Sequence, residues 1–67
     1  MFSFFWYRMD QDSRYIVAME DVPCHTPEGA KDYAVAFFNV QARFLGADRL
    51  AVFRPGADYS MLELSVK

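Results

Sequence analysis

The sequence has few of the cysteine and histidine residues that small domains use to stabilise a small hydrophobic core through disulfides or metal ions. It contains one cysteine, Cys24, and one histidine, His25. A single cysteine excludes an internal disulfide and favours a reducing compartment, so we expect a cytoplasmic protein. A zinc site normally needs three or four protein ligands, which this chain cannot assemble from one Cys and one His. We therefore predict no metal and no cofactor, and we interpret Cys24 and His25 as loop residues.

Long hydrophobic runs are also missing. The apolar stretch from Phe2 to Tyr7 has no basic region before it, is too short for the core of a signal peptide, and leads directly into Arg8. No segment approaches the roughly 20 apolar residues that a membrane span needs. We expect a soluble chain with no targeting peptide and no membrane partner.

The chain lacks an excess of positive charge. Seven basic and nine acidic residues are scattered along it, and the formal net charge is −2. Because neutralisation of phosphates dominates the affinity of proteins for nucleic acids, this balance disfavours nucleic acid as a partner.

Catalytic constellations are missing as well. The three glycines form no phosphate-binding loop, and no Ser or Thr lies in a nucleophile elbow. The carboxylate pairs Asp10/Asp12 and Glu20/Asp21 fall in an expected turn and at an expected strand end, where acids serve turn bonding and solubility. No acid, base and nucleophile converge, so we predict a protein that is not an enzyme and has no catalytic residues.

What the chain does have is apolar side chains, which make up 54% of its 67 residues, with 18% aromatic. A domain of this length buries only about 60% of the surface that its unfolded chain exposes. Domains this small usually gain stability from a disulfide, a metal or association, and only association is left here. We expect one domain over residues 1–67 that associates with itself or with another protein.

Helix signals stand in the middle of the chain. Thr26 is a good N-cap, Pro27 suits the first helical position, and Gly46 is a typical helix terminator, so a helix is predicted over residues 27–45. Its apolar positions form one broad stripe that we expect to face the core: Ala30, Tyr33, Ala34, Phe37, Phe38, Gln41, Phe44 and Leu45.

Strand-like segments flank the helix on both sides. Residues 2–9 and 14–22 surround a polar turn, and residues 50–54 and 58–66 surround Pro55-Gly56-Ala57. The predicted fold is therefore α+β, ββαββ, with a four-stranded antiparallel sheet of two hairpins and one long helix packed on one face. The strand order stays open.

Hairpin registers can be predicted from the turns. An even-length first loop pairs Trp6 with Val17 and Phe4 with Met19, and a three-residue second loop pairs Leu50 with Leu62, Phe53 with Tyr59 and Arg49 with Glu63. The core would then contain Phe4, Trp6, Val17, Met19, Leu50, Val52, Leu62 and Leu64. The opposite face would contain Phe5, Tyr7, Ile16, Ala18, Ala51, Phe53, Tyr59 and Met61.

The second face is the most informative prediction. A solvated sheet face should carry alternating polar residues, whereas a contiguous apolar patch usually marks an interface. We therefore expect a protein-interaction module, an adaptor or inhibitor of a larger protein, that forms a sheet-to-sheet homodimer. Its compact, acidic sequence is typical of small bacterial or phage proteins. The predicted contact residues are Phe5, Tyr7, Ile16, Phe53, Tyr59 and Met61, with Arg14, Arg49 and Arg54 at the rim.

Two alternatives remain open. Aromatic residues beside arginines on a sheet could stack the bases of a single-stranded nucleic acid. The outer side of the helix could also contribute to an interface, because Val35, Ala36 and Val40 make it less polar than a free helix should be.

Overall fold

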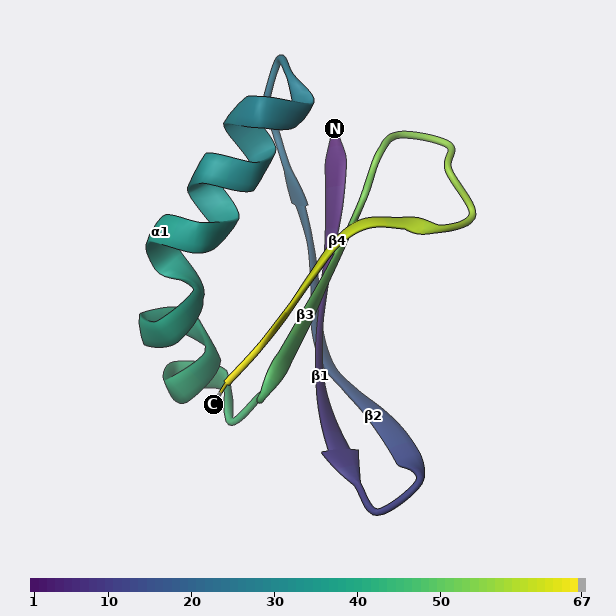
Figure 1. Ribbon diagram of the computed structural model, residues 1–67, viewed down its shortest axis with the longest axis vertical. Helices are drawn as coiled ribbons and strands as arrows, with labels where there is room; N and C mark the ends of the chain where they lie inside the picture. Colours follow the sequence, from purple (N-terminus) through teal and green to yellow (C-terminus); the bar gives the residue numbers. More distant parts are fainter. Residues whose placement is uncertain (67) are drawn as a thin grey trace.

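One antiparallel sheet and one helix make up the fold (Figure 1). The computed structural model describes residues 1–66, and its elements run in the order β1 (Phe2–Asp10), β2 (Ser13–Val22), α1 (Pro27–Leu45), β3 (Arg49–Phe53) and β4 (Ser60–Ser65). The strand order is β2-β1-β3-β4, so the two hairpins join through β1 and β3. The helix lies on one face of the sheet, which confirms the predicted ββαββ fold.

Both ends of α1 are fixed by local chemistry, as predicted. The side-chain oxygen of Thr26 accepts a hydrogen bond of 3.0 Å from the backbone N–H of Gly29. At the other end Gly46 adopts φ 73°, a left-handed conformation that favours glycine, and the N–H of Ala47 donates to the carbonyl of Ala42 over 2.9 Å.

The helix contacts the sheet along a narrow line of mostly small residues, Ala30, Ala34, Phe38 and Ala42. These short side chains let the helix lie close to the sheet, where the Phe38 ring stacks on Trp6 with 6.0 Å between ring centroids. The prediction that Phe37 and Phe44 also face the core is wrong, since both are exposed. Tyr33 is 40% exposed, but the prediction holds for part of its ring, which packs edge-on against Phe4 of the core with 5.7 Å between centroids. The apolar arc of the helix is wider than its contact with the sheet.

A β-bulge changes the register of the first hairpin. Next to the turn the pairing is as the even-length loop requires, with Tyr7 opposite Ile16. The register then shifts by one residue at Val17, so that Trp6 pairs with Ala18, and the predicted Trp6–Val17 pair is wrong. Because side chains alternate between faces, such a shift exchanges the faces of all residues beyond it.

Two residues change their expected face as a result, and a third, Glu20, is placed by the same shift. Met19 pairs with Phe5 and is exposed, whereas it was expected opposite Phe4 in the core. Ala18 packs against the core and not on the opposite face. Glu20 comes to the helix side, where it accepts a hydrogen bond of 3.0 Å from Nε1 of Trp6.

The second hairpin has a longer loop than predicted, residues 54–59. Leu50 therefore pairs with Leu64, and Arg49 stands opposite Ser65, so the predicted Arg49–Glu63 ion pair is wrong. A two-residue slip preserves the faces, which is why Leu50 and Leu64 still share the core side.

An irregularity between Val52 and Phe53 also moves the start of β4. Phe53 pairs with Ser60 and not with Tyr59. Met61 is half-buried and packs against the core, so the prediction that it lies on the opposite face is wrong.

Candidate interaction site on the helix-free face

The face of the sheet that α1 leaves uncovered is called the helix-free face here. Cross-strand rows define it, because paired residues of neighbouring strands point to the same side. One row runs Met19, Phe5, Ala51, Glu63, and the next runs Ile16, Tyr7, Arg49, Ser65. The rows at its two ends are Met9 with Arg14, and Asp21, Ser3, Phe53 and Ser60.

One half of this face is apolar. The rings of Phe5 and Phe53 contact each other with 5.2 Å between centroids, and both side chains are half-buried. Ile16 and Met19 stand beside them and are exposed, Met19 to 66%. The sequence pattern missed Met19, because only the bulge at Val17 turns it to this side.

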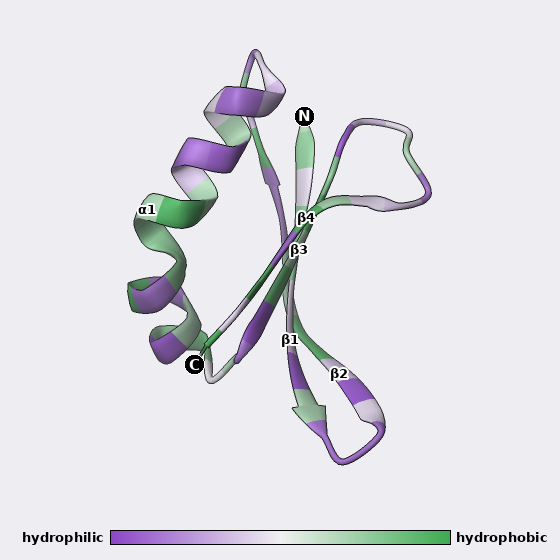
Figure 2. Cartoon of the chain, viewed as in Figure 1, coloured by the Kyte–Doolittle hydropathy of each residue, from purple (hydrophilic) through white to green (hydrophobic). Residues whose placement is uncertain are grey.

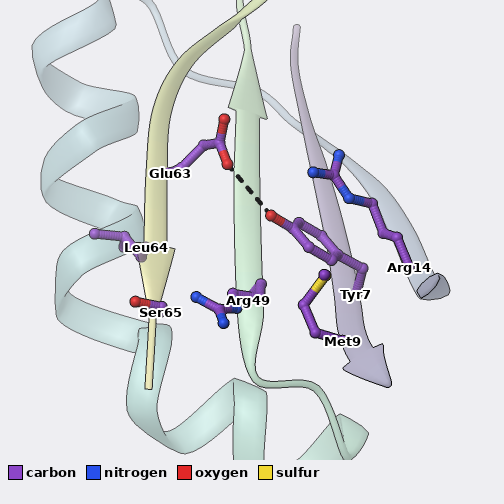
Figure 3. Close-up of a pocket in the computed structure, with 7 residues that line it drawn as sticks. All are labelled: Tyr7, Met9, Arg14, Arg49, Glu63, Leu64 and Ser65. Carbon is purple, nitrogen blue, oxygen red and sulfur yellow. Dashed lines mark hydrogen bonds between the residues drawn. The ribbon is translucent and has the colours of Figure 1, made fainter. Parts of the chain in front are cut away.

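The other half is polar and is organised around Tyr7. Its ring is buried, although it lies outside the core cluster, and the guanidinium of Arg14 sits 4.5 Å from the ring centroid. The Tyr7 hydroxyl donates a hydrogen bond of 3.2 Å to Oε1 of Glu63 (Figure 3). The other carboxylate oxygen of Glu63 accepts a bond of 2.9 Å from the hydroxyl of Ser60.

This environment favours the neutral form of the phenol. Burial raises the pKa of Tyr7 above its ordinary value of 10.0, Arg14 opposes the rise, and the charge and hydrogen bond of Glu63 add to it. Tyr7 is therefore a hydrogen-bond donor at neutral pH.

A shallow cavity of about 290 Å³ opens beside Tyr7, lined by Tyr7, Met9, Arg14, Arg49, Glu63, Leu64 and Ser65 (Figure 3). Nε of Arg49 lies 3.7 Å from Oδ1 of Asp48 and, though buried, has no hydrogen-bond partner among residues 1–66. The Asp48 carboxylate instead accepts the backbone N–H of Met9 over 3.2 Å. The cavity thus brings two guanidinium groups together, which suits the binding of an acidic group, and the Glu63 carboxylate offsets part of their charge.

No family model, curated protein or solved structure matches this chain.

The structure brings together six of the nine predicted contact residues: Phe5, Tyr7, Ile16, Phe53, Arg14 and Arg49. Tyr59 and Arg54 are exposed in the loop between β3 and β4, which projects to the side away from α1 (Figure 1). Met61 belongs to the core side, as described above.

Residues 1–66 were also compared with the requirements of a metal site, a membrane span and a reactive thiol. No group of three His, Cys, Asp or Glu side chains there is placed to hold a metal ion. None of its helices is long and apolar enough to cross a membrane. Cys24 is a free thiol, half-buried in the loop before α1. What converges on the helix-free face is apolar surface and hydrogen-bond donors, which suit binding.

Proposed function

We propose that this protein is a non-catalytic protein-interaction module, an adaptor or inhibitor, and that it docks another protein on the helix-free face. The observation that carries the proposal is the exposed pair Ile16 and Met19 next to the Arg14/Arg49 cavity. Aromatic residues, Met and Arg are the types enriched at protein interfaces, where a few of them supply most of the binding energy.

A protein suits this face better than a single-stranded nucleic acid does. The ring of Tyr7 is already covered by Arg14, so it offers no free surface on which a base could stack. The chain as a whole carries a formal net charge of −2, so it offers a single acidic group a local site but offers a polyphosphate backbone no extended positive surface.

The proposed occupant is a different protein and not a second copy. Tyr7, which would stand at the centre of a self-pairing patch, is buried, and Phe5 and Phe53 cover part of each other. The exposed apolar strip is therefore narrow, and the arginine cavity beside it calls for an acidic group. A partner with an apolar side chain next to a carboxylate fits both halves.

Site-specific photo-crosslinking tests the proposal. A photoreactive residue at Met19 should capture a protein that the same residue at Glu28, on the first turn of α1, does not capture. With that protein purified, Met19→Glu and Arg49→Ala should each weaken binding at least about tenfold, as expected for central contacts. Equal capture at both positions, or affinities unchanged in both variants, would contradict the proposal.

A further inference from the structure

A second exposed apolar surface lies on the helix. Tyr33, Phe37, Val40 and Phe44, called the outer row, are 40%, 53%, 73% and 81% exposed. Figure 2 shows the middle of α1 as strongly hydrophobic, although the helix touches the sheet on one side only. The line that faces the sheet consists of other residues, namely Ala30, Ala34, Phe38 and Ala42. The helix therefore has two apolar faces. The fold covers the second one only at Tyr33, whose ring packs edge-on against Phe4 with 5.7 Å between centroids, and leaves Phe37, Val40 and Phe44 exposed.

The spacing of the outer row is that of a helix-pairing seam. Its members follow one another at intervals of four, three and four residues, which is the a/d pattern of a heptad. Tyr33 and Phe37 already contact each other, with 4.9 Å between ring centroids. A row of this spacing fits the same row on another helix.

We propose that the outer row binds the outer row of a second copy of this chain, with the two helices antiparallel around a two-fold axis. In this arrangement Tyr33 of one copy meets Phe44 of the other, and Phe37 meets Val40. A hollow of about 330 Å³ beside Phe44, lined by Asn39, Val40, Arg43 and Phe44, stands where the other copy's Tyr33 arrives. Each copy thus offers both the exposed part of Tyr33, which Phe4 and Phe37 hold in place, and the recess that receives it.

Charges along the row favour the antiparallel orientation and a second copy as the occupant. Asp32 and Arg43 are exposed and lie on the same flank of the outer row, about 20° apart around the helix axis. In an antiparallel pair the same flank of each helix faces that of the other, so Asp32 of each copy approaches Arg43 of the other. The two residues are then offset by about 3 Å along the helix axis. A parallel pair would place this flank against Ala34 and Gln41, which carry no charge.

The dimer leaves both helix-free faces uncovered, because α1 lies on the opposite side of the sheet (Figure 1). The assembly would be bivalent and could hold two partner molecules or two sites of one partner, which raises apparent affinity without new contacts.

Light scattering coupled to size exclusion tests the pairing on the whole chain at micromolar concentration. The wild-type protein should have twice the mass of one chain, and Val40→Glu and Phe44→Glu should have the mass of one chain with an unchanged far-UV circular dichroism spectrum. Met19→Glu, on the helix-free face, is the matched control and should stay dimeric.

A charge exchange provides a second test that does not disturb the apolar row. Asp32→Arg should weaken the dimer, and the double variant Asp32→Arg/Arg43→Asp should restore it. A monomeric wild type would overturn the inference. So would a dimer that Met19→Glu dissociates and Val40→Glu does not, because that result would place the contact on the sheet.

Discussion

The hydroxyl of Tyr7 donates a hydrogen bond of 3.2 Å to Glu63, which lies 56 positions further along the chain. This bond connects the central strand β1 to the edge strand β4, with β3 between them. Arg14 of the other edge strand covers the Tyr7 ring from its own side. A tyrosine on the helix-free face is thereby buried by polar side chains, which gives this face a fixed structure without a second helix.

The raised pKa of Tyr7 makes stability depend on alkaline pH. In the unfolded chain the phenol loses its proton near pH 10, whereas the folded protein holds it to a higher pH. The unfolded state then binds fewer protons, so the free energy of unfolding falls as pH rises from about 10 through the folded pKa. Below that window this contribution is fully present.

Urea unfolding at about pH 8 and about pH 11 measures the effect. At about pH 8 the free energy of unfolding of Tyr7→Phe should be about 1 kcal/mol lower than that of the wild type, because the substitution removes the hydrogen bond to Glu63. Between about pH 8 and about pH 11 the free energy of unfolding should then fall less in Tyr7→Phe than in the wild type. Tyr59→Phe, at an exposed position, should keep the wild-type dependence. An equal pH dependence in wild type and Tyr7→Phe would rule out this role for Tyr7.

The N-cap gives a prediction about helix stability. Thr26→Ala removes the oxygen that accepts the Gly29 N–H and should lower the free energy of unfolding by about 1 kcal/mol. Thr26→Ser keeps that oxygen and should remain close to the wild type. Urea titrations of the three proteins decide the matter, and an equal loss in Ala and Ser variants would show that the methyl group matters and the cap does not.

Local signals explain which features the sequence could predict. Thr26, Pro27 and Gly46 act within a few residues of the helix ends, so the bounds of α1 could be predicted without knowledge of the rest. The bulge at Val17 depends on how β2 fits against β1, and no turn or breaker residue marks it. Alternation along β2 alone therefore predicts the wrong face for Met19.

The candidate site shows the same division. Strict alternation along β1 placed Phe5 and Tyr7 on the helix-free face correctly. The burial of Tyr7 depends on Arg14 and Glu63, which come from the two edge strands. The first turn predicts the register at Arg14 correctly, whereas Glu63 lies opposite Ala51 because the second loop is longer than predicted. The sequence likewise shows the apolar arc of the helix, but only packing determines which part of that arc is buried. Phe44 belongs to the arc and is exposed.

Cys24 should be replaceable. It is half-buried against the core in the loop before α1, and it has no partner for a disulfide in this chain. Cys24→Ser should retain the far-UV circular dichroism spectrum, the mass in solution and partner binding. The reason is that the sequence places no basic residue other than His25 next to Cys24, where it could stabilise a reactive thiolate. Loss of binding by a folded Cys24→Ser protein would assign the thiol a functional role.

Binding to single-stranded nucleic acid should be no tighter than about 10⁻⁴ to 10⁻⁶ M at physiological salt, the range of non-specific complexes. Stacking on Tyr7 would require Arg14 to leave the ring, and that movement would expose a buried phenol next to the Glu63 carboxylate. The net charge of −2 supplies no compensating attraction for phosphates.

Fluorescence anisotropy with labelled DNA and RNA strands of about 16 nucleotides, at low and at physiological salt, measures this directly. Arg14→Ala and Arg49→Ala serve as matched variants, since both arginines line the cavity beside Tyr7. A sub-micromolar complex that weakens with salt and is lost in both variants would show that this face binds nucleic acid. The expected result is weak binding that is the same in the variants and in the wild type. It would show that the two guanidinium groups do not bind the phosphates of a nucleic acid.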